Sequence, residues 1–212
     1  AEERGMPFLL PSVFFADKDE CPARDGSLPG FLCVGSVDGS RRDYDQLIDA
    51  GILLTERGFS GRYRVSVACS SSETDYYRTF RDNLSRYSLE GDVVVYENLP
   101  FRDLFALARE TPYQLFLLNK RSRWNLKYLA EKITGGINIS FGFGIVPVLE
   151  DVFARRWGVE DLSLVYDGTE GLVGAIEAVV ENPSLFIPNR DRIFAANERL
   201  VAESETSLAS VL

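Results

Sequence analysis

Short apolar runs alternate with helical patterns along most of this chain of 212 residues. Six of the runs have the length and the β-branched or aromatic content of strands. They cover residues 30–35, 63–69, 92–96, 114–118, 145–149 and 162–166. Helical patterns lie between them at 42–57, 74–87, 101–110 and 124–132, and residues 169–205 are mostly helical around a break at Asn182-Pro183. This order predicts parallel strands that are joined by right-handed helical crossovers.

The strands themselves indicate a sheet with helices on both faces. The run Val93-Val94-Val95 is apolar at every position, as a strand between two layers of helices requires. We therefore expect an α/β fold with a single Rossmann-like, doubly wound parallel sheet of about six strands. The domain covers residues 30–205. Residues 1–29 form an N-terminal arm or linker with one apolar island at 6–15, and residues 206–212 form a C-terminal tail.

Composition excludes several classes of function. A formal net charge of −9 argues against nucleic acid or an anionic membrane surface as the partner, because both require a basic face. The longest nearly apolar stretch, residues 139–149, is too short to cross a bilayer, so no transmembrane segment is expected. The chain has no His, which excludes a Ser-His-Asp triad and a His-rich zinc site. A catalytic base must come from a carboxylate, Lys, Tyr or another chain.

The cysteines lack the CxxC spacing of a metal or redox site. Cys33 and Cys69 lie in strand runs, where a thiol behaves as a small apolar side chain, and Cys21 lies in the N-terminal arm. We expect buried free thiols. The sequence assigns no compartment, and a soluble fragment of a cytoplasmic or of a Golgi-type enzyme fits it equally.

Ligands of doubly wound sheets bind beyond the carboxyl ends of the strands, which directs the search to the loops there. The loop after the first strand begins Gly35-Ser36 and ends with Arg41 and Arg42. Glycine lets a ligand approach the backbone closely and Arg binds phosphate, so Gly35, Ser36 and Arg41 are candidates for substrate binding. The alternative is that the loop only leaves the strand and caps the next helix.

A basic run follows the fourth strand of this otherwise acidic chain. Its cations are Lys120, Arg121, Arg123, Lys127 and Lys132. Such a run can hold a diphosphate, since Arg binds phosphate through two hydrogen bonds and Lys is a mobile point charge. A solvated helix face is the alternative.

Two further segments complete the candidate site. Thr134, Gly135 and Gly136 precede an apolar helical start, where free backbone N–H groups attract an anion. Glu150 follows the apolar run 145–149, and a carboxylate in that place can accept hydrogen bonds from ribose hydroxyls. The alternatives are a plain glycine loop for the first segment and, for the second, capping of the next helix by Glu150 or Asp151.

Taken in order, these segments resemble the C-terminal, donor-binding half of the two-domain glycosyltransferases of the GT-B fold. The resemblance is strongest over residues 132–183. That part contains a Lys-x-Thr-Gly helix start, a Gly-Ile-Val-Pro-Val strand followed by an acid, the strand Leu164-Val165-Tyr166 and a helix that ends at Glu-Asn-Pro.

The resemblance implies a role for each matching residue. Lys132, Thr134, Gly135 and Gly136 would contact the diphosphate of a nucleotide sugar, such as a UDP-sugar, and Glu150 its ribose or sugar. The donor is a substrate, so no cofactor is implied. The acceptor site would lie in a partner, an N-terminal Rossmann-like domain of the same chain or of another.

One departure from the family concerns stereochemistry. A known retaining pattern has two glutamates separated by seven residues, and counting back eight places from Glu150 reaches Gly142. Retention by that pattern is therefore not expected.

We conclude from the sequence that the chain is the donor-binding half of a glycosyltransferase, with the acceptor and the catalytic residues unassigned and no metal expected. Two alternatives remain. A non-catalytic module of the same fold would bind a protein or a glycan and expose Phe141, Phe143 and Trp157. A nucleotide-dependent oxidoreductase or sugar-nucleotide epimerase is disfavoured because no GxGxxG follows the first strand.

Overall fold

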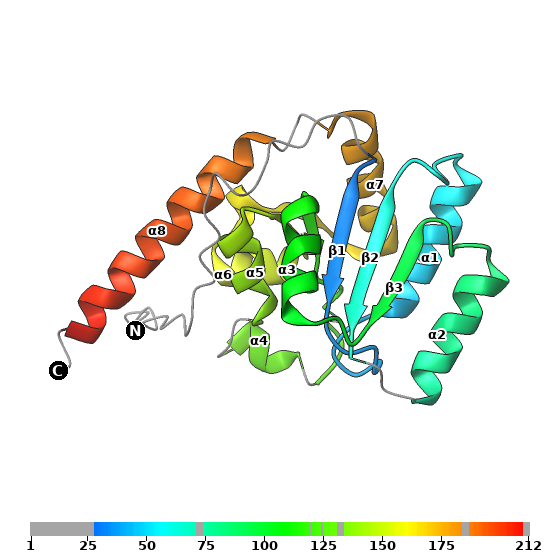
Figure 1. The fold of residues 1–212 in the computed structure, drawn as a ribbon, viewed down its shortest axis with the longest axis horizontal. Helices are drawn as coiled ribbons and strands as arrows, with labels where there is room; N and C mark the ends of the chain where they lie inside the picture. The colour runs from blue at the N-terminus through cyan, green and yellow to red at the C-terminus, as the bar shows by residue number, and fades with distance from the viewer. Residues whose placement is uncertain are drawn as a thin grey trace.

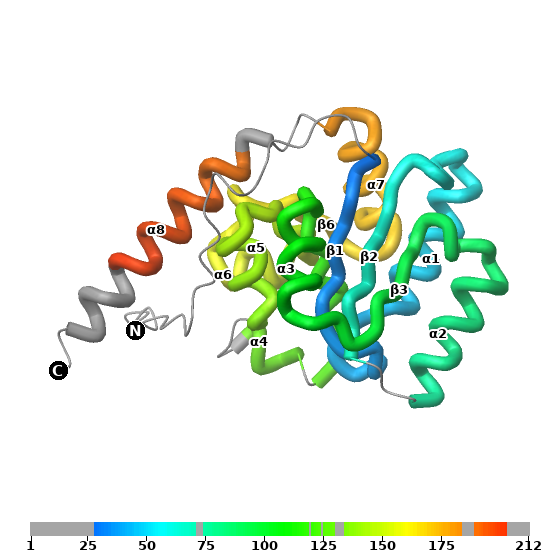
Figure 2. Tube along the Cα trace, viewed as in Figure 1, coloured from blue at the N-terminus to red at the C-terminus, as the bar shows by residue number. Residues whose placement is uncertain are grey.

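The computed structural model describes residues 28–70, 74–118, 120–123, 125–130, 134–183 and 187–209 (Figure 2). Most of the predicted N-terminal arm lies outside these residues, and so do two residues singled out above, Cys21 and Lys132.

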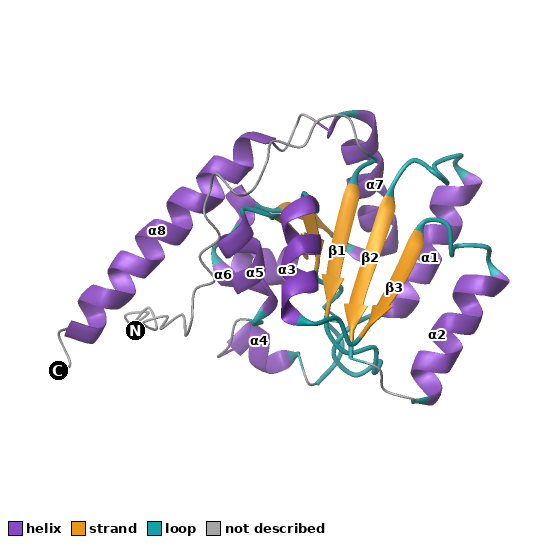
Figure 3. Ribbon diagram, viewed as in Figure 1, coloured by secondary structure: helices purple, strands orange, loops and turns teal. Residues whose placement is uncertain are grey.

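The strands of the described chain form one parallel sheet in the order β3-β2-β1-β4-β5-β6. Figure 3 shows the β3-β2-β1 side of this sheet. Their bounds are Gly30–Val34 for β1, Arg64–Cys69 for β2, Val93–Glu97 for β3, Tyr113–Leu115 for β4, Val146–Glu150 for β5 and Leu164–Tyr166 for β6. The order reverses between β1 and β4, which makes this pair the switch point of a doubly wound sheet. The predicted fold class is confirmed.

Two strands, β4 and β6, have only three residues, fewer than the sequence predicts. The strand expected at 114–118 ends at Leu115, because Leu117 adopts a left-handed backbone with φ of 48° that no strand can continue. The strand expected at 162–166 begins at Leu164, since Leu162 closes a short 3-10 helix over Glu160–Leu162. The apolar content of a segment does not predict such turns.

The helices cover both faces of the sheet. They are α1 (Tyr44–Glu56), α2 (Asp75–Arg86), α3 (Phe101–Glu110), α4 (Leu126–Ala130), α5 (Gly136–Phe143), α6 (Asp151–Trp157), α7 (Gly168–Glu181) and α8 (Ile187–Ala209). Figure 1 shows α3 and α5 in front of the sheet and α1 and α2 behind it. The first two helices begin as the sequence suggests, because Asp43 and Thr74 each accept a hydrogen bond at 3.1 Å from a backbone N–H of the first turn.

The core consists of two clusters. The larger cluster joins β1, β2, β4 and β5 to α1, α2 and α7 and extends to α5, α6 and α8, and the smaller one lies beneath α3, α5 and α8. Cys33 and Cys69 are buried free thiols in the larger cluster, which confirms the prediction for these two. Burial raises the pKa of the Cys33 thiol. Burial is also the main reason why the pKa of the Cys69 thiol is raised to about 11.

Candidate functional site

At the carboxyl edge of the sheet, the loop after β1 is joined to the loop after β4. The backbone N–H of Asp43 donates to the carbonyl oxygen of Leu117 at 2.7 Å, and Arg42 pairs with Leu118 in an isolated antiparallel bridge. The guanidinium of Arg42, itself buried, donates to the carbonyl oxygen of Phe116. We call this contact of Arg42 and Asp43 with residues 116–118 the loop bridge. It closes the switch point between β1 and β4.

The sequence of the first loop explains why the bridge forms. Gly35 has a φ of 143°, and a Cβ there would lie 3.0 Å from Cζ of Arg42 and nearer still to Nε. The Asp38 carboxylate accepts hydrogen bonds at 2.9 Å from both the N–H and the hydroxyl of Ser40, which sets the turn. Gly35 thus permits the close approach of Arg42, where the sequence suggested the approach of a ligand.

A pocket of about 250 Å³ lies on one side of the loop bridge. We call it the arginine pocket, and it is lined by Gly35, Ser36, Arg41, Arg42, Leu118, Tyr128, Thr134 and Gly135. It brings together the loop after β1 and the start of α5, two of the predicted segments. No carboxylate is among these lining residues, so its charge is positive.

The two arginines of this pocket differ in burial and in the contacts that their guanidinium groups make. Arg42 is buried and committed to Phe116, whereas Arg41 is exposed and forms no ion pair with the described residues. The hydroxyl of Thr134 accepts a hydrogen bond at 3.5 Å from the N–H of Gly136. The N–H groups of Ile137 and Asn138 likewise donate to the carbonyl oxygens of Thr134 and Gly135. Arg41 is therefore the cation that an anion in this pocket would meet.

Gly136 has a packing role that the sequence did not reveal. A Cβ at this position would lie 3.0 Å from the amide nitrogen of Gln114 and 3.1 Å from the ring of Phe116. Gln114 is buried and accepts a hydrogen bond at 2.6 Å from Ser140. Gly136 therefore lets α5 approach β4, and it does not line the arginine pocket.

A second, larger pocket of about 480 Å³ lies on the other side of the loop bridge. We call it the carboxylate pocket, and it is lined by Asp43, Asp45, Gln46, Asp49, Lys120, Arg121, Glu150, Asp167, Gly168 and Thr169. Lys120 and Arg121 come from the predicted basic run, while Arg123 and Lys127 line neither pocket. Five carboxylates against two cations make this pocket acidic.

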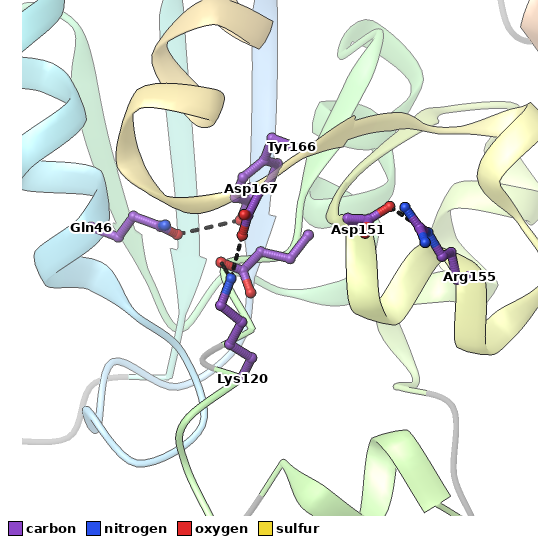
Figure 4. A network of polar contacts seen from close by, with 7 residues as sticks. Gln46, Lys120, Asp151, Arg155, Tyr166 and Asp167 are labelled. Carbon is purple, nitrogen blue, oxygen red and sulfur yellow. Dashed lines mark hydrogen bonds and ion pairs between the residues drawn. The ribbon is translucent and has the colours of Figure 1, made fainter.

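Lys120 is held by two of these carboxylates (Figure 4). Its ammonium nitrogen forms a close ion pair with Asp167 and lies 3.6 Å from Oε1 of Glu150. The pKa of Lys120 is raised, mainly by its hydrogen bond to Asp167. The same contact lowers the pKa of the Asp167 carboxyl. Lys120 thus links the end of β4 to the ends of β5 and β6.

Glu150 is the buried acid of the pocket, with 6% of its surface exposed. Burial raises the pKa of its carboxyl, and the ammonium of Lys120 and the backbone N–H of Gly168 oppose that rise. Its Oε2 atom has no hydrogen-bond partner among the described residues. Glu150 does not cap α6 through its side chain, and Asp151 pairs with Arg155 at 2.8 Å outside the pocket, so the capping alternative fails for Glu150.

Some residues of the carboxylate pocket were missed by the sequence analysis. Asp167 follows β6 directly, so the rule that directed attention to Glu150 after β5 would also have found it. Asp45 and Asp49 have no such signal, because they lie in the first turns of α1 among other polar side chains. Only the packing of α1 beside α7 places them at this edge.

The binding-module alternative made a prediction that is wrong. It required Phe141, Phe143 and Trp157 to be exposed, and all three are buried. Within the described part of the chain, no group of three or more acidic or sulfur ligands could hold a metal ion. No described helix has the length and apolar character needed to span a membrane.

Comparison with known proteins yields structural similarity without sequence similarity. No protein-family model matches the sequence, and no curated protein matches it. A trehalose-6-phosphate synthase structure is similar with a TM-score of 0.63 and 11% identity, over 93% of this chain and 50% of that one. Trehalose-6-phosphate synthase from Burkholderia xenovorans, in complex with glucose-6-phosphate, has a TM-score of 0.61 at 14% identity and covers 87% and 43%.

One solved structure matches over nearly its full length. It is the C-terminal domain of a group 1 glycosyl transferase, LpcC, from Francisella tularensis, with a TM-score of 0.59 and 11% identity over 90% of this chain and 94% of that one. The chain spans about half the length of the trehalose-6-phosphate synthases it matches. At these identities the similarity establishes the fold and one domain of it.

Proposed function

We propose, from the premise that this chain has the fold of a GT-B glycosyltransferase C-terminal domain, that it binds the nucleotide-diphosphate sugar donor of such an enzyme. The observation that carries the proposal is the pair of pockets at the carboxyl edge, one cationic and one rich in carboxylates, which share the loop bridge as a wall. A nucleotide sugar has the matching division into an anionic diphosphate and neutral parts rich in hydroxyls.

The arginine pocket suits the diphosphate. Arg41 offers a guanidinium that no described carboxylate neutralises, and Thr134 and Gly135, just before α5, line the same space. Gly35 and Ser36 also line this pocket and add no bulky side chains. Lys132, which lies outside the described residues, precedes Thr134 by two positions and is proposed to add a further cation.

The carboxylate pocket suits hydroxyl groups. A carboxylate only accepts hydrogen bonds when ionised, and the unpartnered Oε2 of Glu150 leaves capacity for a donor such as a ribose or sugar hydroxyl. Lys120 and Arg121 lie in the same pocket at the side of the β4 loop. We assign them to the boundary between the two parts of the donor, where each can reach a phosphate oxygen.

The chemistry that follows is stabilisation of the departing nucleoside diphosphate. Cations and helix N–H groups that are fixed before the reaction lower the energy of the negative charge that develops as the sugar leaves. Arg41 and Lys120 supply this stabilisation. The acceptor and its general base belong to a second, N-terminal domain on the same chain or a partner, since the similar trehalose-6-phosphate synthases are about twice as long.

Calorimetric titration with nucleoside diphosphates and their sugar conjugates, UDP and UDP-sugars first, tests the proposal. We expect dissociation constants in the micromolar to millimolar range, and binding that is about tenfold weaker in Arg41→Ala and also weaker in Lys132→Ala. Arg86→Ala is the matched control, because Arg86 lies in the last turn of α2 at the opposite edge of the sheet. Absence of binding across the panel, or equal binding by all the variants, would refute the donor assignment.

A non-catalytic module remains the second candidate function. The observation that favours it is the pairing of Lys120 with Asp167 and Glu150, which reduces the charge available to a departing diphosphate. The two candidates separate when the protein is supplied with a donor and its N-terminal partner domain. Donor binding without sugar transfer or donor hydrolysis would select the module.

A further inference from the structure

The carboxylate pocket contains more negative charge than its own cations neutralise. Five carboxylates line it, together with two cations, Lys120 and Arg121. Lys120 already pairs with Asp167 and lies 3.6 Å from Glu150. The other three carboxylates belong to the N-terminal part of α1 and its cap, and no ion pair joins them to a described cation. We call Asp43, Asp45 and Asp49 the α1 acids.

The α1 acids repel one another. Asp45 and Asp49 are four residues apart on one face of α1, a spacing at which like charges destabilise a helix. Burial raises the pKa of the Asp45 carboxyl most, the charges of the other two α1 acids raise it further, and a hydrogen bond from Tyr76 opposes the rise. The helix dipole favours acids in the first turn, but Asp49 lies beyond it. A cation beside the α1 acids would therefore stabilise the folded chain.

The pocket also contains an unused hydrogen-bond acceptor. Glu150 is 6% exposed, and its Oε2 atom has no partner among the described residues. An ionised carboxylate only accepts hydrogen bonds, so the missing partner must be a donor. Tyr166 pairs with Glu150 across β5 and β6, and its hydroxyl donates to Gln46 of α1 at 3.4 Å (Figure 4). The α1 acids and the unused acceptor therefore border the same pocket from neighbouring elements.

The spacing of the carboxylates favours an organic cation over a metal ion. Calcium and magnesium ions need several oxygen ligands within about 2.6 Å of one point. Among the described residues, no group of three or more acids is placed in that way. An ammonium group needs only one or two direct carboxylate contacts and is attracted by further carboxylates at longer range. The volume of about 480 Å³ is that of a site for a small organic molecule.

We propose that the sugar bound in the carboxylate pocket is an amino sugar whose amine is free and carries a positive charge. This inference rests on the proposed function, in which the diphosphate lies in the arginine pocket and the sugar beyond the loop bridge. The ammonium lies among the α1 acids, and a hydroxyl of the same sugar donates to Oε2 of Glu150. Lys120 and Arg121 repel an ammonium, but the carboxylates outnumber them and both cations are assigned to the phosphate side.

Calorimetric titration of the full chain with UDP-glucosamine and UDP-glucose tests the inference. The two ligands differ in one group, an amine in place of a hydroxyl, so the ratio of their dissociation constants isolates the effect of the ammonium. At slightly acidic pH and low salt we expect UDP-glucosamine to bind about tenfold more tightly, because its ammonium donates to carboxylates. In Asp45→Asn/Asp49→Asn this ratio is expected to fall to about twofold. A ratio taken within one protein cancels any effect of the substitutions on folding or on the diphosphate.

Asp82→Asn/Glu90→Gln is the matched control and is expected to keep the ratio of the wild type. Both acids are exposed, on α2 and just after it, and line neither pocket. Equal binding of the two ligands by the wild type, or an unchanged ratio in Asp45→Asn/Asp49→Asn, would overturn the inference and leave the proposed function standing. Binding of UDP-glucose that Mg²⁺ strengthens in the wild type but not in that variant would also overturn it, because a metal ion would then lie among the α1 acids. Failure of UDP and both conjugates to bind would refute the proposed function and this inference with it.

Discussion

The arginine pocket and the carboxylate pocket share a wall and differ in what their charged groups already contact. In the arginine pocket Arg41 has no described ion-pair partner. In the carboxylate pocket Lys120 is held by Asp167 and Glu150. A free guanidinium can bind an incoming anion directly, whereas a paired ammonium must first give up part of its existing contacts. The comparison teaches that the number of cations in a site overstates its affinity for phosphate when some of them are already neutralised.

The largest expected effect comes from breaking the wall between the pockets. In Gly35→Ala the new methyl group overlaps the buried guanidinium of Arg42 at a φ of 143°, and we expect a loss of about 3 kcal/mol in the free energy of unfolding. Gly58→Ala is the control, because its φ of 79° costs about 1 kcal/mol but its Cβ meets nothing within 4 Å. Urea denaturation measures both. Equal losses would show that the loop bridge does not depend on close approach at Gly35.

The next largest effect is on the affinity for a nucleoside diphosphate, which we compare between a variant in each pocket. Arg41→Ala is expected to weaken binding by about tenfold, since it removes an unpaired charge. Lys120→Ala is expected to weaken it by about threefold, since part of that charge is already used. Calorimetry measures both constants at one salt concentration. A larger loss in the Lys120 variant would contradict the difference between the pockets.

A smaller effect in the opposite direction follows from releasing Lys120. In Asp167→Asn the ammonium loses its closest carboxylate, so we expect nucleoside diphosphate to bind about twofold more tightly at neutral pH. Asp161→Asn is the control, because this exposed acid precedes β6 at the other edge of the sheet. Both variants lose one negative charge, which cancels the effect of net charge. Equal affinities in the two variants would indicate that the pairing of Lys120 does not limit binding.

The smallest effect concerns the pH dependence of stability. Burial raises the pKa of Glu150, so the folded state holds its proton to a higher pH than the unfolded state. The contribution of Glu150 to the free energy of unfolding therefore falls as the pH rises from the pKa of Glu150 in the unfolded state to its higher pKa in the folded state. In Glu150→Gln this fall is expected to disappear, so the variant gains stability relative to the wild type as pH rises from 4 towards neutrality. Thermal unfolding across that range measures it, and parallel curves would contradict it.

Local pattern was sufficient for the fold and for the positions of most candidate loops. The alternation of apolar runs with helical patterns predicted each strand of the sheet, since the period of apolar residues depends on neighbours only a few places away. The predicted ends of two strands, at 118 and 162, were wrong: β4 ends at Leu115 and β6 begins at Leu164, because of a backbone turn at Leu117 and a 3-10 helix before Ser163. These features leave no periodic trace in the sequence.

By itself, then, the sequence determined a doubly wound α/β domain and placed Gly35, Arg41, Thr134 and Glu150 at the edge where its strands end. The tertiary structure alone decided which of these residues share a pocket, that Gly136 packs on the sheet, and that Lys120 is paired with Asp167. The physical reason is the separation along the chain of the residues that interact. Periodicity is set by adjacent residues, whereas these contacts join segments far apart in the chain that meet only through the strand order of the sheet.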